Sequence, residues 1–261
     1  ELNKFKTNLQ LPKDLNFHLL FNSRNIRRKC IPDTIMAWKL FMDKLPENER
    51  SKCLLTLKTE AVFDPGTDLP AVIEYFGTNN VRILDHKLST QEMDMLYNTA
   101  DGVVQLSNAE GWGLSLTEAM LTGTPFIATV TGGMQDQMRF EDENGKWIEF
   151  TSEIPSNHHG KYKKHGEWAF PVYPKTSGIV GSPQTPYIYD DHIDAKDASE
   201  QMMKLYKMGN EERKRIGKLG QEWALGDEAG FTSEKMSNKI IEAAEKLFTT
   251  WKPRKKYSFL K

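Results

Sequence analysis

Cysteine is scarce in this sequence of 261 residues, in which Cys30 and Cys53 are the only two. Two cysteines are too few for the disulfide framework that stabilises small secreted domains, and their scarcity weakly favours a reducing compartment. Apolar segments instead recur between polar ones along the chain. We therefore expect a fold that rests on a packed core.

Excess charge and long apolar runs are missing as well. The 35 basic residues almost balance the 36 acidic ones, and a net charge of −1 argues against a nucleic-acid partner. No apolar run approaches the ~20 residues that a membrane-spanning helix needs. The start, Glu1-Leu2-Asn3-Lys4, has no signal-peptide pattern and no Met. We expect a cytoplasmic protein, and a chain that is part of a longer one.

Strand-like and helix-like segments alternate along the first half of the chain. The predicted strands are 17–21, 53–57, 81–84, 101–106 and 126–130, and the predicted helices are 33–44, 67–76, 90–100 and 113–122, with a short one after Gly132-Gly133. This alternation implies right-handed crossovers. It predicts an α/β fold with a Rossmann-like, doubly wound parallel sheet.

The flanking segments follow a different pattern. Residues 1–15 are polar with little periodicity, so we interpret them as a lead-in linker to a Rossmann-like domain over 16–250. Residues 139–193 are rich in proline, glycine and aromatic residues, which predicts a long irregular insertion, more often functional or mobile than idle. Predicted C-terminal helices span 195–208, 211–224 and 233–251, and a basic tail covers 251–261. That tail could touch an anionic membrane, but a solvated tail is favoured because one short cluster attracts a membrane only weakly.

Two carboxylates, Glu110 and Glu118, flank the start of the predicted helix 113–122. Free backbone N–H groups and the macrodipole make a helix N-terminus favourable for anions, and open parallel sheets bind ligands at their carboxyl edge. A phosphate could rest on the N–H groups while the carboxylates accept hydrogen bonds from sugar hydroxyls. The loop predicts a site for a sugar joined to a phosphate. A capping acid at Glu110 and a solvent-facing side chain at Glu118 are the alternatives.

Four cations follow the first predicted strand, at the same edge of the sheet: Arg24, Arg27, Arg28 and Lys29. Arg24 and Lys29 could neutralise a diphosphate, the arginine as a planar fork and the lysine as a point charge. A solvated basic loop is the alternative. The cluster alone is a weak signal, and it becomes a strong one beside the two glutamates.

The motif Glu110-x7-Glu118 resembles the signature of retaining GT-B glycosyltransferases with an E-x7-E motif, the group 1 or family four type. The supporting matches, in order along the chain, are Arg24-x4-Lys29, residues 96–101, Glu118-Ala119-Met120, Gly123-Thr124-Pro125 and Gly132-Gly133. The resemblance runs from about residue 5 to 138 and more loosely over 194–250. Cys30 departs from it, because the family usually has glycine there.

The resemblance implies that the chain is the C-terminal, donor-binding half of a GT-B architecture. The N-terminal Rossmann-like domain, which usually carries the acceptor site, would then be absent from this chain. Glu110 would hold hydroxyls of the donor sugar near its reacting face, and Glu118 would bind the nucleotide ribose. Backbone N–H groups of Gly111, Trp112 and Gly113 would contact the sugar, those of Leu114 and Ser115 the phosphates, and His86, Lys87 and Leu88 the base. Whether Trp112 packs on the sugar or wedges the loop stays open.

These observations predict a retaining, metal-independent transferase that moves a hexose from a nucleotide-diphosphate sugar to a glycan or lipid-linked acceptor, without a cofactor. The alternatives are a nucleotide-sugar-binding module that transfers nothing by itself, and a sugar-nucleotide epimerase of related fold. No Asp-x-Asp pair ends a strand, and the histidines match no zinc-site spacing, so we expect no metal. The histidines concerned are His158, His159 and His165, and Asp190, Asp191 and Asp194 are expected to cap or precede the next helix.

Overall fold

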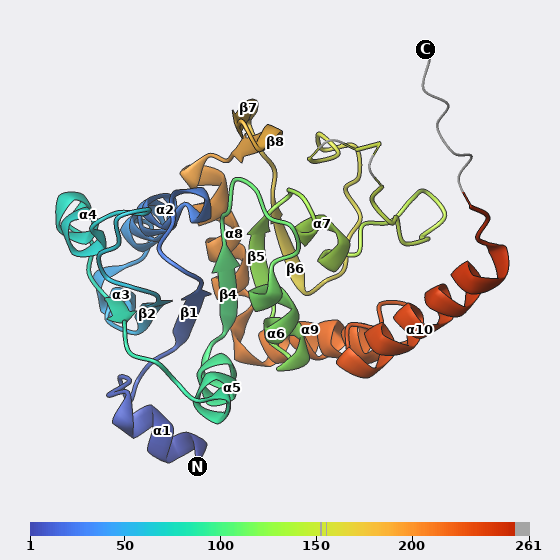
Figure 1. The fold of residues 1–261 in the computed structure, drawn as a ribbon. Helices are drawn as coiled ribbons and strands as arrows, with labels where there is room; N and C mark the ends of the chain where they lie inside the picture. The colour runs from blue at the N-terminus through green and yellow to red at the C-terminus, as the bar shows by residue number, and fades with distance from the viewer. Residues whose placement is uncertain (152, 155, 254–261) are drawn as a thin grey trace. The chain divides into compact units, whose positions relative to one another are not determined.

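The computed structural model describes residues 1–151, 153–154 and 156–253 (Figure 1). The chain divides into two compact units, residues 1–222 and 223–261. Most of the predicted basic tail, from Arg254 onward, lies outside the described residues. Within the described ranges, no helix has both the length and the apolarity to cross a membrane.

A six-stranded parallel sheet forms the centre of the first unit. Its strands are β1 (Phe17–Asn22), β2 (Cys53–Lys58), β3 (Val81–Leu84), β4 (Gly102–Gln105), β5 (Phe126–Thr129) and β6 (Ala169–Val172), in the order β3-β2-β1-β4-β5-β6. The strand order reverses at β1, which lies between β2 and β4. In open α/β sheets such a switch point opens a crevice at the carboxyl ends of the strands, where ligands bind. The predicted Rossmann-like parallel sheet is confirmed.

Helices connect these strands and cover the sheet. They are α2 (Ile31–Asp43), α3 (Glu47–Arg50), α4 (Leu69–Phe76), α5 (Thr90–Thr99), α6 (Leu114–Leu121), α7 (Met134–Gln137), α8 (Ala195–Lys207) and α9 (Gly209–Leu225), with a 3-10 turn, η1 (Arg27–Lys29), before α2. Local signals fix their starts: Asp68 caps α4, and Ser89 forms a capping box with Glu92 at α5. The core lies where α2 and α8 pack with the sheet, around Trp38 and Phe41.

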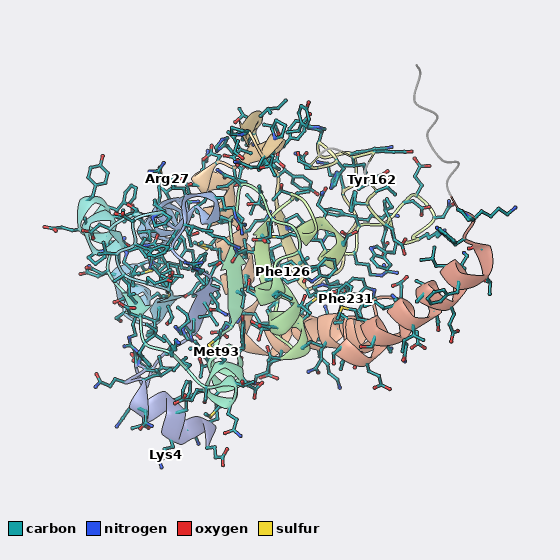
Figure 2. All side chains as sticks on the ribbon, viewed as in Figure 1. Lys4, Arg27, Met93, Phe126, Tyr162 and Phe231 are labelled. Carbon is teal, nitrogen blue, oxygen red and sulfur yellow. The ribbon has the colours of Figure 1, made fainter. Side chains whose placement is uncertain are left out.

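The buried strands explain why sequence patterns located the sheet well. Strands β1, β2, β4 and β5 bury nearly every residue, as strands covered on both faces do. Phe126 of β5, the strand next to β6, is fully buried (labelled in Figure 2). Because both faces of these strands are buried, their sequences are short apolar runs bounded by turn residues.

Two expectations about secondary structure were wrong. The lead-in segment contains a helix, α1 (Leu2–Asn8), which buries Phe5. The segment 139–193 contains β6 and an antiparallel hairpin of β7 (Thr176–Ser182) and β8 (Thr185–His192). Pro171 made β6 hard to recognise from the sequence, yet β6 is one of the two edge strands of the sheet, where proline is tolerated. In the described part of 139–168 the only pairing is an isolated bridge between Glu141 and Trp147.

The second unit contains one long helix, α10 (Ser233–Thr250), in the place predicted from the sequence. Thr232 caps it by accepting a hydrogen bond from the backbone N–H of Lys235. Before this helix, the rings of Trp223 and Phe231 pack edge to face with centroids 5.2 Å apart. The described residues of this unit end at Pro253.

Candidate functional site

A cleft of about 750 Å³ opens at the carboxyl ends of β1, β2 and β3, beside the start of α6. We call it the carboxyl-edge cleft. Nine of the residues singled out in the sequence line it: Arg24, Lys29, Lys87, Glu110, Trp112, Gly113, Leu114, Ser115 and Glu118. Three others, His86, Leu88 and Gly111, are not among its lining residues. The fold thus gathers segments that lie up to 94 positions apart in sequence, from Arg24 to Glu118, into one site.

Glu110 is held by two cations rather than one. Its Oε2 accepts hydrogen bonds from Lys29 Nζ and, at 2.9 Å, from Arg28 Nη1. Arg28 also donates to the carbonyl of Ala109 at 2.8 Å, which fixes the loop before Glu110. Lys29 is buried, with 8% of its surface exposed, whereas the side chain of Arg28 is 43% exposed. One carboxylate shared between two cations leaves a local surplus of positive charge.

The pKa values of this group show how the surplus is distributed. Burial lowers the pKa of Lys29, and the attraction of Glu110 only partly offsets that effect. Burial acts in the opposite direction on Glu110, but Lys29 and Arg28 together outweigh it, so the pKa of Glu110 lies below its usual value. Glu110 is therefore a well-compensated carboxylate. The buried Lys29 cation is compensated only in part and would gain from an additional anion nearby.

Glycines allow the Glu110 loop to approach the segment after β5. A side chain at Gly132 would lie 1.9 Å from the carbonyl oxygen of Glu110, and one at Gly133 would lie 2.2 Å from that of Gly111. The backbone N–H of Gly133 donates to the Glu110 carbonyl at 3.2 Å. The paired glycines noted in the sequence therefore serve to position Glu110.

The N-terminus of α6 faces the cleft with its backbone donors uncapped by any side chain. Gly113 occupies the N-cap position with φ of +89°, a left-handed conformation that glycine adopts without strain. Ser115 and Leu114 follow in the first turn and line the cleft. Free N–H groups at this position suit an anionic ligand.

Trp112 is fixed within the loop by its polar atoms. Its indole Nε1 donates to Thr117 Oγ1 at 2.9 Å, and Thr117 in turn donates to Gln137. The carbonyl of Trp112 accepts from Gln137 Nε2 at 2.6 Å. These contacts favour the interpretation that Trp112 wedges the loop, although the residue also lines the cleft.

Glu118 belongs to a second hydrogen-bonded group that the sequence did not suggest. Its Oε2 accepts from the hydroxyl of Tyr97 at 2.5 Å, and Asn22 Nδ2 donates to the same hydroxyl at 2.9 Å. Burial, followed by the neighbouring Glu118 charge, raises the pKa of Tyr97, which keeps its hydroxyl a donor. Asn22, Tyr97 and Glu118 come from β1, α5 and α6, so only the fold unites them.

Arg24 is placed differently from Lys29. Its guanidinium Nε lies 3.8 Å from Glu60 Oε1, and its Cζ lies 5.1 Å from the centroid of the Phe63 ring. The side chain is 69% exposed. Arg24 borders the cleft, whereas the cations paired with Glu110 are Arg28 and Lys29.

The acidic residues after the hairpin divide into two roles. Asp194 caps α8 as expected, with its carboxylate accepting from the Lys196 N–H at 2.8 Å. Asp191 does not act as a cap: it is fully buried, and its carboxylate accepts from Thr131, Asn157 and two serines, Ser156 and Ser177. The buried carboxylate therefore ties the hairpin and the insertion to the end of β5. No sequence pattern indicates this role of Asp191.

The insertion histidines show no metal-binding arrangement. Across the described ranges, no group of three or more His, Cys, Asp or Glu side chains is placed to hold a metal ion. His158 instead packs among Phe140, Phe150 and Tyr162, with its ring stacked on Phe150 at 5.6 Å. Burial lowers its pKa to about 4. It is a neutral core residue of the insertion.

Comparisons with known proteins show which sequences this chain resembles. Residues 71–154 match the family model of glycosyl transferases group 1, a segment that contains Glu110 and Glu118 but not Lys29. A curated relative, D-inositol 3-phosphate glycosyltransferase of Arthrobacter sp. (strain FB24), is 30% identical over 118 residues, which cover 45% of this chain and 27% of the relative. Residues 71–154 are thus similar to glycosyltransferase group 1 sequences.

Solved structures support the fold assignment. Sucrose-phosphate synthase (tll1590) from Thermosynechococcus elongatus matches with a TM-score of 0.64 and 18% identity, covering 95% of this chain and 49% of that one. Anabaena Alr3699/HepE in complex with UDP-glucose matches with a TM-score of 0.63 and 18% identity, covering 94% and 52%. The chain has the Rossmann-like α/β fold found in about half of each of these structures. The chain spans about half the length of these structures.

Proposed function

We propose that this chain is the donor-binding half of a retaining glycosyltransferase whose donor is a nucleotide-diphosphate sugar. One observation carries the proposal. Arg28 and Lys29 share the single carboxylate of Glu110, and this group lies next to the start of α6, which no side chain caps. A diphosphate placed there would meet Lys29 and the free N–H groups of the helix. Charge-assisted hydrogen bonds of this kind are among the strongest in proteins.

The two glutamates divide the donor between them in this proposal. Glu118, oriented by Tyr97 at 2.5 Å, accepts hydrogen bonds from the ribose hydroxyls. Glu110 accepts them from the sugar and lies near its reacting face. The motif Glu110-x7-Glu118, which resembles that of retaining enzymes, is the support for retention of anomeric configuration.

Catalysis would consist of stabilising the negative charge that develops on the departing diphosphate. Preorganised cations and helix N–H groups supply this stabilisation without reorganisation during the reaction. Lys29, Arg28 and the start of α6 would fill the role that a divalent ion has in metal-dependent transferases. We therefore propose a metal-independent reaction.

A panel of nucleotide sugars tests the donor assignment. UDP-glucose is the first candidate, because HepE, which has a similar fold, is described in complex with it. UDP-, GDP- and ADP-glucose should be compared by thermal shift, since a ligand at ~100 times its Kd stabilises the folded state by about 2.7 kcal/mol. A shift with one base, lost in Lys29→Met, supports the proposal. No shift with any of the three sugars or their free nucleoside diphosphates would refute it.

A binding module without transfer activity is the second candidate. It is favoured by one observation, namely that the chain spans about half the length of the solved structures it resembles. Transfer requires an acceptor hydroxyl held against the sugar, and such positioning supplies much of the rate. An N-terminal Rossmann-like domain would hold the glycan or lipid-linked acceptor. Multiple turnovers by this chain alone with a glycan acceptor pool would exclude the second candidate.

A further inference from the structure

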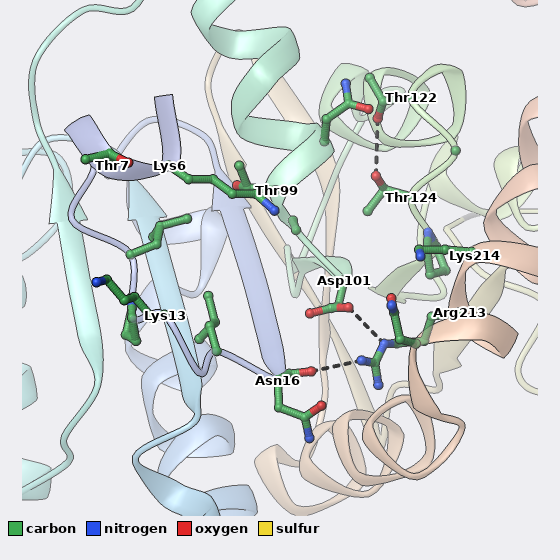
Figure 3. Close-up of a pocket in the computed structure, with 18 of the residues that line it drawn as sticks. Lys6, Thr7, Lys13, Asn16, Thr99, Asp101, Thr122, Thr124, Arg213 and Lys214 are labelled. Carbon is green, nitrogen blue, oxygen red and sulfur yellow. Dashed lines mark hydrogen bonds and ion pairs between the residues drawn. The ribbon is translucent and has the colours of Figure 1, made fainter. Parts of the chain in front are cut away.

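A second pocket, of about 880 Å³, lies at the opposite edge of the sheet (Figure 3). It is formed where β1, β4 and β5 begin, between α1 and the start of α9. We call it the amino-edge pocket. Its volume is within the range of ligand-binding clefts, ~300–1,000 Å³. Because it opens at the other ends of the strands, it is not part of the carboxyl-edge cleft.

The charges around this pocket are unequal. Four cations line it, Lys6, Lys13, Arg213 and Lys214, together with a single carboxylate, Asp101. The carboxyl-edge cleft, in contrast, is lined by four cations and four carboxylates. The whole chain carries a net charge of −1, so this surplus does not reflect a generally basic surface.

The one carboxylate is already neutralised. Asp101 Oδ1 accepts from Arg213 Nε at 3.0 Å, and its Oδ2 accepts from the backbone N–H of His18 at 2.8 Å. Arg213 is 3% exposed and also donates to the carbonyls of Tyr206 and Asn16. Figure 3 shows the Arg213 guanidinium between Asp101 and Asn16. This group forms a fixed, neutral wall of the pocket.

The lysines lack comparable partners. Among the ion pairs between described residues, neither Lys6 nor Lys13 has a carboxylate within 4.0 Å. Lys214 is 3.4 Å from Glu211, and both side chains are largely exposed, so this pair is weak. Asn210, in the first turn of α9, adds a neutral amide to the lining. Three lysines with weak or no ion pairs among the described residues therefore line one cavity.

We propose that the amino-edge pocket binds a small molecule bearing phosphate, with two or more negative charges. Lysines from α1, the loop before β1 and α9 all line this one pocket, and such a set suits a phosphate approached from several sides. The proposal is independent of the donor assignment, because the two sites share no lining residue.

Calorimetric titration with inorganic pyrophosphate tests this inference. The titration uses the Lys29→Met background, in which the carboxyl-edge cleft has lost its buried cation. The test variant adds Lys6→Ala and Lys214→Ala, one lysine from α1 and one from α9. The matched control adds Lys4→Ala and Lys218→Ala, which change the same two helices and the same charge but do not line the pocket (Lys4 is labelled in Figure 2).

We expect one pyrophosphate per chain, with a Kd that rises at least about tenfold in the test variant, or ~1.4 kcal/mol, and stays within about twofold in the control. Circular dichroism on both variants checks that they fold. The absence of pyrophosphate binding in the Lys29→Met background would overturn the proposal. An equal loss of affinity in test and control variants would overturn it too, because the attraction would then come from overall charge.

Discussion

Replacing Lys29 by methionine separates the proposed role of this residue in binding from any role in folding. Methionine keeps most of the buried stem and removes only the ammonium group. Glu110 is not left alone, because Arg28 stays 2.9 Å from its Oε2. Burial lowers the pKa of Lys29, so the charged form is disfavoured in the folded protein. The substitution should therefore change the free energy of unfolding by less than ~1 kcal/mol.

The effect on ligand binding should be much larger. A charge-assisted hydrogen bond contributes about 1.5–3 kcal/mol. Its loss corresponds to a roughly 10- to 150-fold increase in the Kd of a nucleoside diphosphate. The sugar should matter little here, because Lys29 is assigned to the diphosphate. The nucleoside diphosphate and its sugar conjugate should lose similar affinity.

Calorimetric titration of the preferred nucleoside diphosphate measures this effect. The control is Lys39→Met, which removes a lysine of α2 that pairs with Asp43 and does not line the carboxyl-edge cleft. The Kd of the nucleoside diphosphate for Lys39→Met should stay within about twofold of its Kd for the unmodified chain. Unchanged affinity in Lys29→Met, or an equal loss in both variants, would refute the assignment of Lys29 to the diphosphate.

The remaining predictions concern the two glutamates, the metal and the pH. Glu118→Gln should weaken the nucleoside diphosphate and its sugar conjugate alike, whereas Glu110→Gln should weaken mainly the conjugate; equal losses in all four titrations would contradict this division. Tyr97→Phe should weaken the nucleotide, and in a double-mutant cycle its effect should be smaller once Glu118 is already Gln; full additivity would argue against an orienting role. Donor binding should survive EDTA, and a tenfold loss restored by magnesium or manganese would disprove metal independence. Burial lowers the pKa of His18 and His158 from 6.5 to about 4, so the unfolded chain binds more protons in this window and stability should fall as the pH drops through it. Urea unfolding should show a flatter pH dependence for His158→Phe, and an unchanged slope would exclude His158 as a source.

The sequence was most informative where burial imposes a pattern. Strands such as β4 and β5, covered on both faces, leave short apolar runs that any parallel sheet requires. The predicted helix start at residue 90 is confirmed, and Ser89 caps α5 there. Patterns failed in the segment from β6 to β8, because Pro171 disguises an edge strand and the hairpin strands are largely exposed.

The candidate site was predictable only along single stretches of chain. The residues Glu110 and Glu118 belong to one continuous loop and helix, so their spacing could be interpreted directly. Arg28 is adjacent to Lys29, but no spacing rule distinguishes which of several neighbouring cations turns toward Glu110. The contact between Tyr97 and Glu118 joins α5 to α6 and depends on how both helices pack on the sheet. Such contacts require the three-dimensional structure.

A crystal structure of this chain with its preferred nucleoside diphosphate would test the proposed donor site directly. We expect the diphosphate within hydrogen-bonding distance of Lys29 and of the N–H groups at the start of α6, and the ribose hydroxyls on Glu118. A nucleotide bound elsewhere on the chain, or bound in the cleft with its diphosphate turned away from Lys29, would contradict it.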